Sequence, residues 1–209
     1  MPGTKAPEAE RKEQILAAAF DVAAHEGLEG MTILQVSRAA GLSPGLVMFH
    51  FKTKRALVLA VLDHLLTTTT VLRVPPEVSS IASPAERWVE LLRREMQRFS
   101  GEPLRIRLTF DFWAAGIRDQ EVADRLRAEF ARYRKAFLPF AASVIQAMPD
   151  RFAGATAKGL AAVGVSMIKG CAVQAMIAPD HFDIDSYLVA VEGLLWRMGS
   201  ASARSPGLA

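Results

Sequence analysis

The residues from Thr32 to Lys54, TILQVSRAAGLSPGLVMFHFKTK, decide the fold of this chain. They form two short apolar segments, and each follows a residue that commonly caps a helix. Thr32 precedes the first segment with Gln35 three residues later, which is the spacing of a capping box. Ser43 precedes the second, with Pro44 at the first helical position, where its missing N–H costs nothing. We therefore predict two short helices joined by a tight turn.

The turn between the two helices is predicted at Gly41, because glycine adopts a positive φ without steric cost. Ala39 and Ala40 are small enough to let the helices cross closely. A helix, a tight turn and a second helix form the helix-turn-helix motif, whose second helix lies in the major groove of DNA. The side chains expected to hold the two helices at a fixed angle are Val36, Leu42 and Val47.

The charge of this region suits a nucleic acid. No acidic residue lies between Glu29 and Asp63, although the formal net charge of the whole chain is only +3. A local group of cations is what the phosphate backbone attracts, whatever the global balance. The basic residues of this interval are Arg38, Lys52, Lys54 and Arg55.

Outside the motif the pattern is helical nearly throughout. Apolar residues recur every three or four positions, strand-like alternation is absent, and Ser83-Pro84-Ala85-Glu86 gives another helix-start signal. We predict an all-α chain of about nine helices, with a linker at Val74–Ser80. The expected parts are a disordered N-terminus at 1–8, a helix-turn-helix domain at 9–53, a connecting helix at 54–73, an effector-binding and dimerisation domain at 74–198 and a disordered tail at 199–209.

Composition narrows the class of protein further. Hydrophobic residues make up 51% of the chain, enough for a sizeable core, and the single cysteine, Cys171, excludes an internal disulfide framework. The polar start lacks the apolar segment of a signal peptide. The most apolar stretch, Gly159–Ile177, is interrupted by Lys169, which favours a buried helix over a membrane span. We expect a cytoplasmic protein with no membrane partner, no metal and no cofactor.

The segment Gly41–Lys54 resembles the signature of the TetR family of bacterial one-component regulators, and so does its setting after a long first helix. The resemblance implies a DNA-binding head followed by a helical domain that binds an effector and dimerises. Position 48 is usually tyrosine in the family, where its hydroxyl helps to hold a phosphate, but Met48 has no hydroxyl. Pro44 also departs from the usual lysine or polar residue. The head is therefore expected to rely on Ser43, His50 and apolar contacts with thymine methyl groups.

The residues expected to contact DNA lie at helix starts and along the second helix of the motif. Thr32 and Lys54, at the starts of the flanking helices, suit phosphate contacts that fix the register without reading the sequence. His50 has a second interpretation, a hydrogen bond to a carbonyl at its helix end, and Phe51 is expected in the core. The predicted contacts are Thr32, Ser43, Pro44, Gly45, Leu46, Met48, Phe49, His50 and Lys54.

The later part of the chain loosely resembles the BetI-type branch of the family, whose members respond to choline. Its aromatic and methionine side chains predict an apolar pocket, although each of them also suits an ordinary core. Lys169 stands where the branch usually has an acid. If Lys169 faces the pocket, an anionic effector is favoured over a quaternary ammonium; if it faces solvent or pairs with Glu192, it carries no information. The predicted pocket residues are Met96, Phe99, Phe110, Trp113, Phe137, Met167, Cys171 and Gln174.

These patterns predict a sequence-specific transcriptional regulator, a repressor that a small organic effector releases from a palindromic operator. One small head contacts few base pairs, so a two-fold homodimer on double-stranded DNA is expected. The resemblance places the dimer interface on the last two long helices. The protein would act in the bacterial cytoplasm, associated with the nucleoid when bound to DNA.

Two other interpretations remain at this point. Met48 raises the alternative of a small-molecule-binding helical protein with a vestigial DNA-binding head. An enzyme is the second, because His181 lies near Asp183 and Ser186. However, Asp183 suits a helix cap, and the sequence contains no nucleophile elbow, no cysteine–histidine pair spaced for a metal and no phosphate loop. We therefore predict that the protein is not an enzyme.

Overall fold

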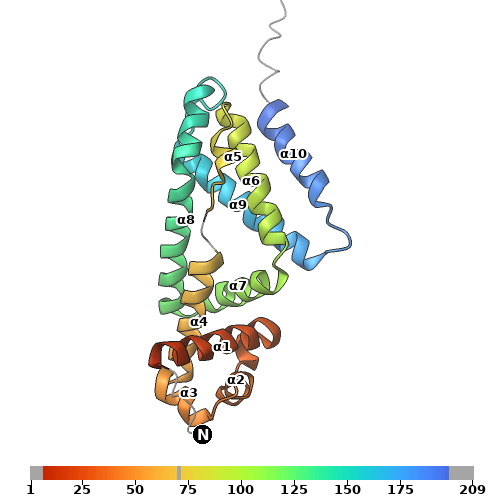
Figure 1. The fold of residues 1–209 in the computed structure, drawn as a ribbon. Helices are drawn as coiled ribbons and strands as arrows, with labels where there is room; N and C mark the ends of the chain where they lie inside the picture. The colour runs from red at the N-terminus through yellow and green to blue at the C-terminus, as the bar shows by residue number, and fades with distance from the viewer. Residues whose placement is uncertain (1–6, 70–71, 198–209) are drawn as a thin grey trace, which may run out of the picture. The chain divides into compact units, whose positions relative to one another are not determined.

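The computed structural model describes residues 7–69 and 72–197. The predicted tail at 199–209, and all but two residues of the predicted N-terminal segment, lie outside these ranges. Within them the chain folds into ten helices and no strand (Figure 1), which confirms the predicted all-α class. The packing divides the chain into two compact units. The first unit combines residues 7–69 with 104–129, and the second combines 72–103 with 130–197.

The first unit contains the helix-turn-helix. Its α1 is interrupted at Gly27, whose φ of 76° is one that glycine adopts without strain. One further helical turn follows before the chain enters the motif. The helices of this unit are α1 (Glu8–Gly30), α2 (Ile33–Ala39), α3 (Pro44–Phe51), α4 (Lys54–Thr69), α7 (Pro103–Gly116) and the start of α8 (Gln120–Ala147).

The helix starts predicted from capping residues are confirmed. The hydroxyl of Thr32 accepts a hydrogen bond from the backbone N–H of Gln35 at 3.2 Å, and the Gln35 side chain accepts one from the Thr32 N–H at 3.1 Å. Ser43 caps α3 by accepting a hydrogen bond from the N–H of Leu46, also at 3.2 Å. Ser83 caps α6 in the same way. Local side-chain chemistry therefore sets where these helices begin.

The core of the first unit forms around α4. Leu57, Val61 and Leu65 on one side of the helix are fully buried, and Leu59, Leu62 and Leu66 on other sides are buried too. Because α4 is apolar on so much of its circumference, α1–α3 alone do not cover it. Leu108 and Phe112 of α7 and Val122 and Leu126 of α8 complete the same core. This packing assigns residues 104–129 to the first unit, whereas chain order groups them with the domain at 74–198.

The second unit contains α5 (Pro76–Ser79), α6 (Pro84–Ser100), the rest of α8, α9 (Ala157–Ile177) and α10 (Ile184–Arg197). A short helix, α5, forms within the predicted linker at Val74–Ser80. Pro76 occupies the first turn of this short helix, and Val78 is fully buried. Burial of that one apolar side chain against the unit stabilises a turn that the local sequence does not specify.

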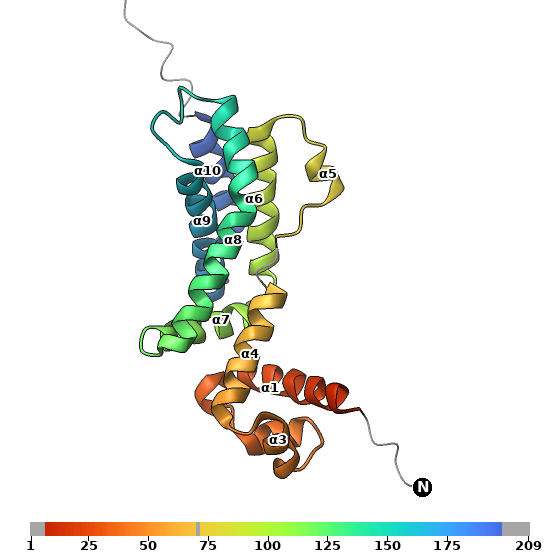
Figure 2. The same cartoon turned by 90° about the vertical axis from the view of Figure 1, so that its left-hand side faces the viewer.

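Helices α6 and α9 pack closely against each other; α9 passes behind α6 in Figure 1, and α8 is drawn between them in the turned view of Figure 2. By length and composition α9 could cross a membrane, but 44% of its most apolar window is buried inside the unit. A core helix of a soluble protein passes the same test. Gly164 permits the close approach: a Cβ at this position would lie 2.7 Å from Trp88 Cζ2 and 3.1 Å from Leu92 Cδ2.

We expect Gly164→Ala to destabilise the second unit by about 1–3 kcal/mol, because the added methyl group overpacks against the buried Trp88 ring. Gly170→Ala on the same helix is the matched control, since a Cβ there meets nothing within 4 Å. The control should leave stability unchanged or raise it by up to about 1 kcal/mol, as alanine is the better helix former. Thermal and urea unfolding followed by circular dichroism measures both. Equal midpoints for the two variants would contradict the proposed close contact.

Candidate nucleic-acid interface and ligand site

Helix α3 is held from one side only. Val47 and Phe51 are buried in the first unit's core, which confirms the prediction for Phe51. The opposite face carries Gly45, Met48 and Phe49, all exposed. Met48 is 38% exposed and Phe49 is 59% exposed, although both side chains are large and apolar. An apolar surface on a helix that is otherwise anchored indicates a face built for contact.

The turn before α3 is formed as predicted. Gly41 has a φ of 64°, the left-handed conformation that glycine adopts without strain. The backbone N–H of Leu42 donates to the carbonyl of Ser37 at 2.8 Å, and the Gln14 amide of α1 donates to the carbonyl of Ala40, also at 2.8 Å. These bonds fix the end of α2 against α1. The start of α3 is therefore presented at a defined angle.

Seven of the nine predicted DNA contacts lie on α3 or at its cap, and Thr32 and Lys54 begin the flanking helices. Ser43, Pro44 and Gly45 at the start of α3 are exposed, while Leu46 and His50 are half-buried. The Thr32 hydroxyl donates to Gln35 Oε1 at 2.8 Å as part of its capping box. Lys54 is exposed in the first turn of α4. The exposed side chains of α3 and its cap are thus mostly small or apolar, and the exposed positions that begin the flanking helices are polar or charged.

One contact on this face was not anticipated from the sequence. The Nζ of Lys52 lies 4.5 Å from the ring centroid of Phe49, and the His50 ring meets the same phenylalanine edge-on at 5.3 Å. Lys52 has a positive φ of 60°, which turns it sharply at the end of α3. Its cation therefore sits beside the exposed aromatic ring. The sequence signal for this contact was the position of Lys52, a basic residue three positions after the aromatic Phe49.

Arg55 has a different role from the one its charge suggested. Its guanidinium binds Asp119 at 2.6 Å and Glu121 at 2.9 Å, so two carboxylates of the α7–α8 region already neutralise it. Arg125 of α8 extends the network to Asp63 of α4 at 2.7 Å. These pairs join α4 to the start of α8 within the first unit. Of the basic residues between Glu29 and Asp63, this leaves Arg38, Lys52 and Lys54 for contact with phosphates.

The predicted pocket residues separate between the units. Phe110 and Trp113 belong to the first unit, where their rings meet edge-to-face at 4.7 Å. The other six belong to the second unit, and they differ in burial. Gln174 is exposed and Met167 is half-buried. The fully buried members are Met96, Phe99, Phe137 and Cys171.

The interior of the second unit also contains charged groups. Glu95 of α6 is 3% exposed and binds Arg98 Nη2 at 2.6 Å, and it accepts a hydrogen bond from the buried Tyr133 hydroxyl. Burial, and then the charge of Glu95, raise the pKa of Tyr133, so its hydroxyl stays protonated. Lys169 is 7% exposed, so its side chain does not face solvent, and Glu192 pairs with Arg93 of α6. The position of Glu95 on the otherwise apolar stripe of α6 was the sequence signal for this group.

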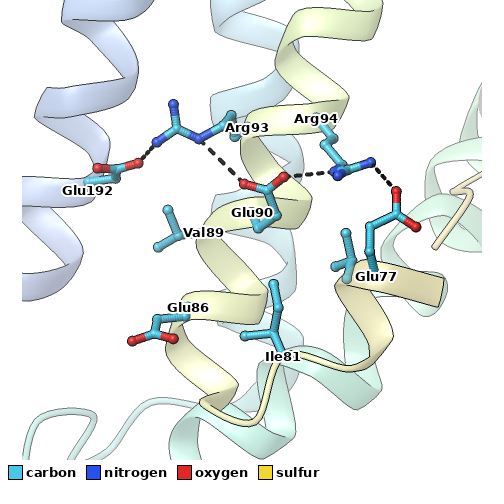
Figure 3. Close-up of a pocket in the computed structure, with 9 residues that line it drawn as sticks. Glu77, Ile81, Glu86, Val89, Glu90, Arg93, Arg94 and Glu192 are labelled. Atoms are coloured by element: carbon cyan, nitrogen blue, oxygen red, sulfur yellow. Dashed lines mark hydrogen bonds and ion pairs between the residues drawn. The ribbon is translucent and has the colours of Figure 1, made fainter. Parts of the chain in front are cut away.

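A surface pocket of about 380 Å³ lies elsewhere on the second unit (Figure 3). Acidic and basic side chains alternate along it. Arg93 bridges Glu192 and Glu90, and Arg94 bridges Glu90 and Glu77. None of the eight predicted pocket residues lines it. Its remaining lining residues are Val78, Ile81, Glu86 and Val89.

Asp183, which together with His181 and Ser186 had suggested an enzyme, caps α10. Asp183 Oδ1 accepts hydrogen bonds from the N–H groups of Asp185 at 3.0 Å and Ser186 at 3.2 Å. The Ser186 hydroxyl bond holds the pKa of Asp183 below its usual value. No group of three or more His, Cys, Asp or Glu side chains is placed to hold a metal within the part of the chain that the structure describes.

Comparison with known proteins agrees with this geometry. The family model for bacterial regulatory proteins of the tetR family matches residues 15–61, and the model for the BetI-type transcriptional repressor C-terminal domain matches residues 84–198. The HTH-type transcriptional regulator BetI of Cronobacter sakazakii is 25% identical over 179 residues, covering 84% of both chains. BetI of Stenotrophomonas maltophilia is 26% identical over 183 residues, covering 87% of this chain and 89% of its own.

Solved structures share the fold. A transcriptional regulator from Saccharomonospora viridis in complex with choline has a TM-score of 0.71 at 17% identity, covering 90% of this chain and 96% of its own. FadR from Bacillus subtilis in complex with stearoyl-CoA has a TM-score of 0.67 at 16% identity, covering 88% and 96%. Fold and matched domains together define a helix-turn-helix transcriptional regulator, a class that does not consist of enzymes. The chain belongs to the tetR family of bacterial regulatory proteins, with a C-terminal domain of the BetI repressor type.

The ion pair between Arg55 and Asp119 predicts a measurable titration. The Arg55 hydrogen bonds, together with the backbone N–H groups that Asp119 caps, hold the pKa of Asp119 at about 2. A depressed carboxyl pKa means that the pair persists above it and is lost only as the pH falls through about 2. We expect Arg55→Ala to raise the Asp119 pKa toward 3.8, measured by carboxyl ¹³C NMR titration. Arg127→Ala, which alters a separate exposed pair with Asp124, should leave it unchanged. An Asp119 pKa unmoved by Arg55→Ala would show that the pair does not form.

Proposed function

We propose that this regulator is a repressor which binds a palindromic operator as a homodimer and is released by a small organic effector. The exposed apolar face of α3, held rigidly by two capped helices, is the observation that carries the DNA-binding part. The BetI repressor type of the C-terminal domain supports repression. The protein acts in the bacterial cytoplasm, associated with the nucleoid when it is bound, and has no enzymatic activity of its own.

The contacts divide by role. Ser43 and Gly45 at the start of α3 come nearest the base edges, with the helix dipole favouring adjacent phosphates. Thr32 and Lys54 hold phosphates at the edges of the face and fix the register. Pro44, Leu46 and His50 line the same approach. Phosphate contacts supply affinity that does not depend on sequence, so specificity must come from the centre of the face.

The centre of the face reads thymine. Met48 and Phe49 have no hydrogen-bonding group, and the major groove offers them one apolar feature, the thymine methyl group. The neighbouring Lys52 lies over the Phe49 ring and restricts where that ring points. Sequence discrimination by this head is therefore apolar at the positions under Met48 and Phe49.

A homodimer is supported by the outer surfaces of α9 and α10. Four large apolar side chains are exposed on these helices: Val163, Ile177, Val189 and Leu194. An isologous pairing through these two helices buries them and places two heads on one operator. The centres of the two half-sites would be separated by one helical turn of DNA, roughly 34–36 Å.

Release follows from a change in the first unit. Helix α7 shares the core of α4, and Arg105 of α7 donates to Thr68 of α4 at 2.8 Å. An effector that contacts Phe110 and Trp113 displaces α7 around Phe110–Gly116, and α4 follows. The spacing of the two heads then no longer matches the operator. The effector can shift this equilibrium only by its difference in affinity for the two states.

We expect Gly45→Ala to weaken operator binding at least tenfold without loss of stability. A Cβ at Gly45 meets only Ser43 Oγ, at 4.0 Å, so the free protein accommodates the methyl group, but DNA approaching this turn does not. Fluorescence anisotropy of the full chain with a duplex selected from random DNA measures the affinity between 50 and about 200 mM salt. Ser83→Ala is the control: it removes the side-chain cap of α6, which lies outside the DNA-binding unit, and should leave DNA binding unchanged. Wild-type binding that is absent, or insensitive to salt, would favour the alternative of a ligand-binding protein with a vestigial head.

Replacement of thymine by deoxyuridine tests the apolar contacts, because it removes only the methyl group. We expect substitution at the thymines of each half-site to weaken wild-type binding about three- to tenfold. Phe49→Ala should lower affinity for the thymine operator and bind the two operators about equally. His50→Ala, on the same helix, should keep the preference for thymine. A preference that survives in both Phe49→Ala and Met48→Ala would contradict this role for the two side chains.

A further inference from the structure

Lys169 is an unusual residue for the interior of α9. The residues around it on the buried side of this helix are small or apolar, among them Val165, Ile168 and Ala172. A buried ammonium is unfavourable unless its surroundings replace the water that it has lost. The position of Lys169 therefore depends on what lies around its Nζ.

Two aromatic rings face that ammonium. The Nζ lies 4.1 Å from the ring centroid of Phe99 on α6 and 5.4 Å from that of Tyr133 on α8. Both rings are buried, and they stand at 73° to one another with centroids 6.4 Å apart. Two ring faces that converge on one cation form the arrangement with which proteins bind organic ammonium groups.

A buried carboxylate is hydrogen-bonded to one of these two aromatic side chains. Glu95 lies one helical turn before Phe99 and accepts the Tyr133 hydroxyl hydrogen bond. Arg98 also binds Glu95, at 2.6 and 3.2 Å, which orients the carboxylate beside the rings. The aromatic walls are thus fixed in place by a hydrogen bond and an ion pair of the same unit.

The other lysine–aromatic contacts of the described residues differ from this one. Lys52 lies over the Phe49 ring and Lys12 over the Phe51 ring, at 4.5 and 5.7 Å. Both of these lysines are exposed and each meets a single ring. Lys169, in contrast, is buried and meets two ring faces, and the Tyr133 hydroxyl beside it is bonded to a carboxylate.

We propose that Phe99, Tyr133 and Glu95 form a binding site for a monovalent organic cation, and that Lys169 occupies this site as an intramolecular ligand. The native protein therefore does not accept a free quaternary ammonium at these rings, because its own side chain fills the place. Removal of the lysine side chain leaves the rings and the carboxylate, with space for a small cation between them. The inference concerns ligand binding alone and does not depend on the proposed operator.

The test uses tetramethylammonium as the probe, with isothermal titration calorimetry on the full chain. We expect Lys169→Ala to bind it with a dissociation constant at least tenfold lower than the wild type. Neutral tert-butanol, which has nearly the same shape, should bind the variant at least fivefold more weakly than tetramethylammonium, because only a cation is attracted to the ring faces. Lys158→Ala, an exposed lysine of the same helix, should behave as the wild type. Adding Phe99→Leu to Lys169→Ala should abolish the gain.

Three results would overturn the proposal: equal binding by wild type and Lys169→Ala, equal binding of the two probes, or a gain that survives Phe99→Leu. If Lys169→Ala does not fold, NMR of the wild type decides instead. The ε-methylene protons of Lys169 should resonate upfield of those of Lys158, because they lie over an aromatic ring, and Phe99→Leu should reduce that shift. An unshifted Lys169 signal would also overturn the proposal.

Discussion

The structure of the DNA-binding head depends on the burial of α4. A head formed only by the first three helices has too little apolar surface to stabilise itself. Helix α4 supplies it, but its buried residues point in several directions, so the core is completed only by Leu108 and Phe112 of α7 and by Val122 and Leu126 of α8. The reading helix is thus supported by residues that follow it by more than fifty positions in the chain. Regulation can use this dependence directly, because a helix distant in sequence belongs to the core that positions α3.

The sequence is most informative where a side chain bonds to its own neighbouring backbone. The starts of α2, α3 and α6 could be predicted because Thr32, Ser43 and Ser83 each cap a helix within three residues. The turn at Gly41 is equally local, since it needs only one residue with a positive φ. The family signature lies in the same interval, so the class of protein and the DNA-facing residues could be proposed from it.

Contacts between distant residues could not be predicted in this way. Helix α5 depends on the burial of Val78, and Arg55 is neutralised by Asp119, sixty-four residues away. The bond between Tyr133 and Glu95 spans thirty-eight residues. Periodicity can place a residue on the inner face of a helix, as it does for Phe99, but it does not show which partner that face meets. The predicted pocket list mixes residues of both units for this reason, because aromatic residues mark cores and ligand sites alike.

The pairing of Arg55 bears on how this regulator searches a chromosome. Non-operator DNA is held almost wholly by contacts between cations and phosphates. Between Glu29 and Asp63 one of the four arginine and lysine side chains is committed to carboxylates of its own unit. A head with fewer cations for the backbone holds random sequence briefly, and it makes short slides interrupted by dissociation. With the proposed thymine contacts, the apolar fit of α3 to the bases governs the time on the chromosome, and the operator is distinguished mainly by how slowly the protein leaves it.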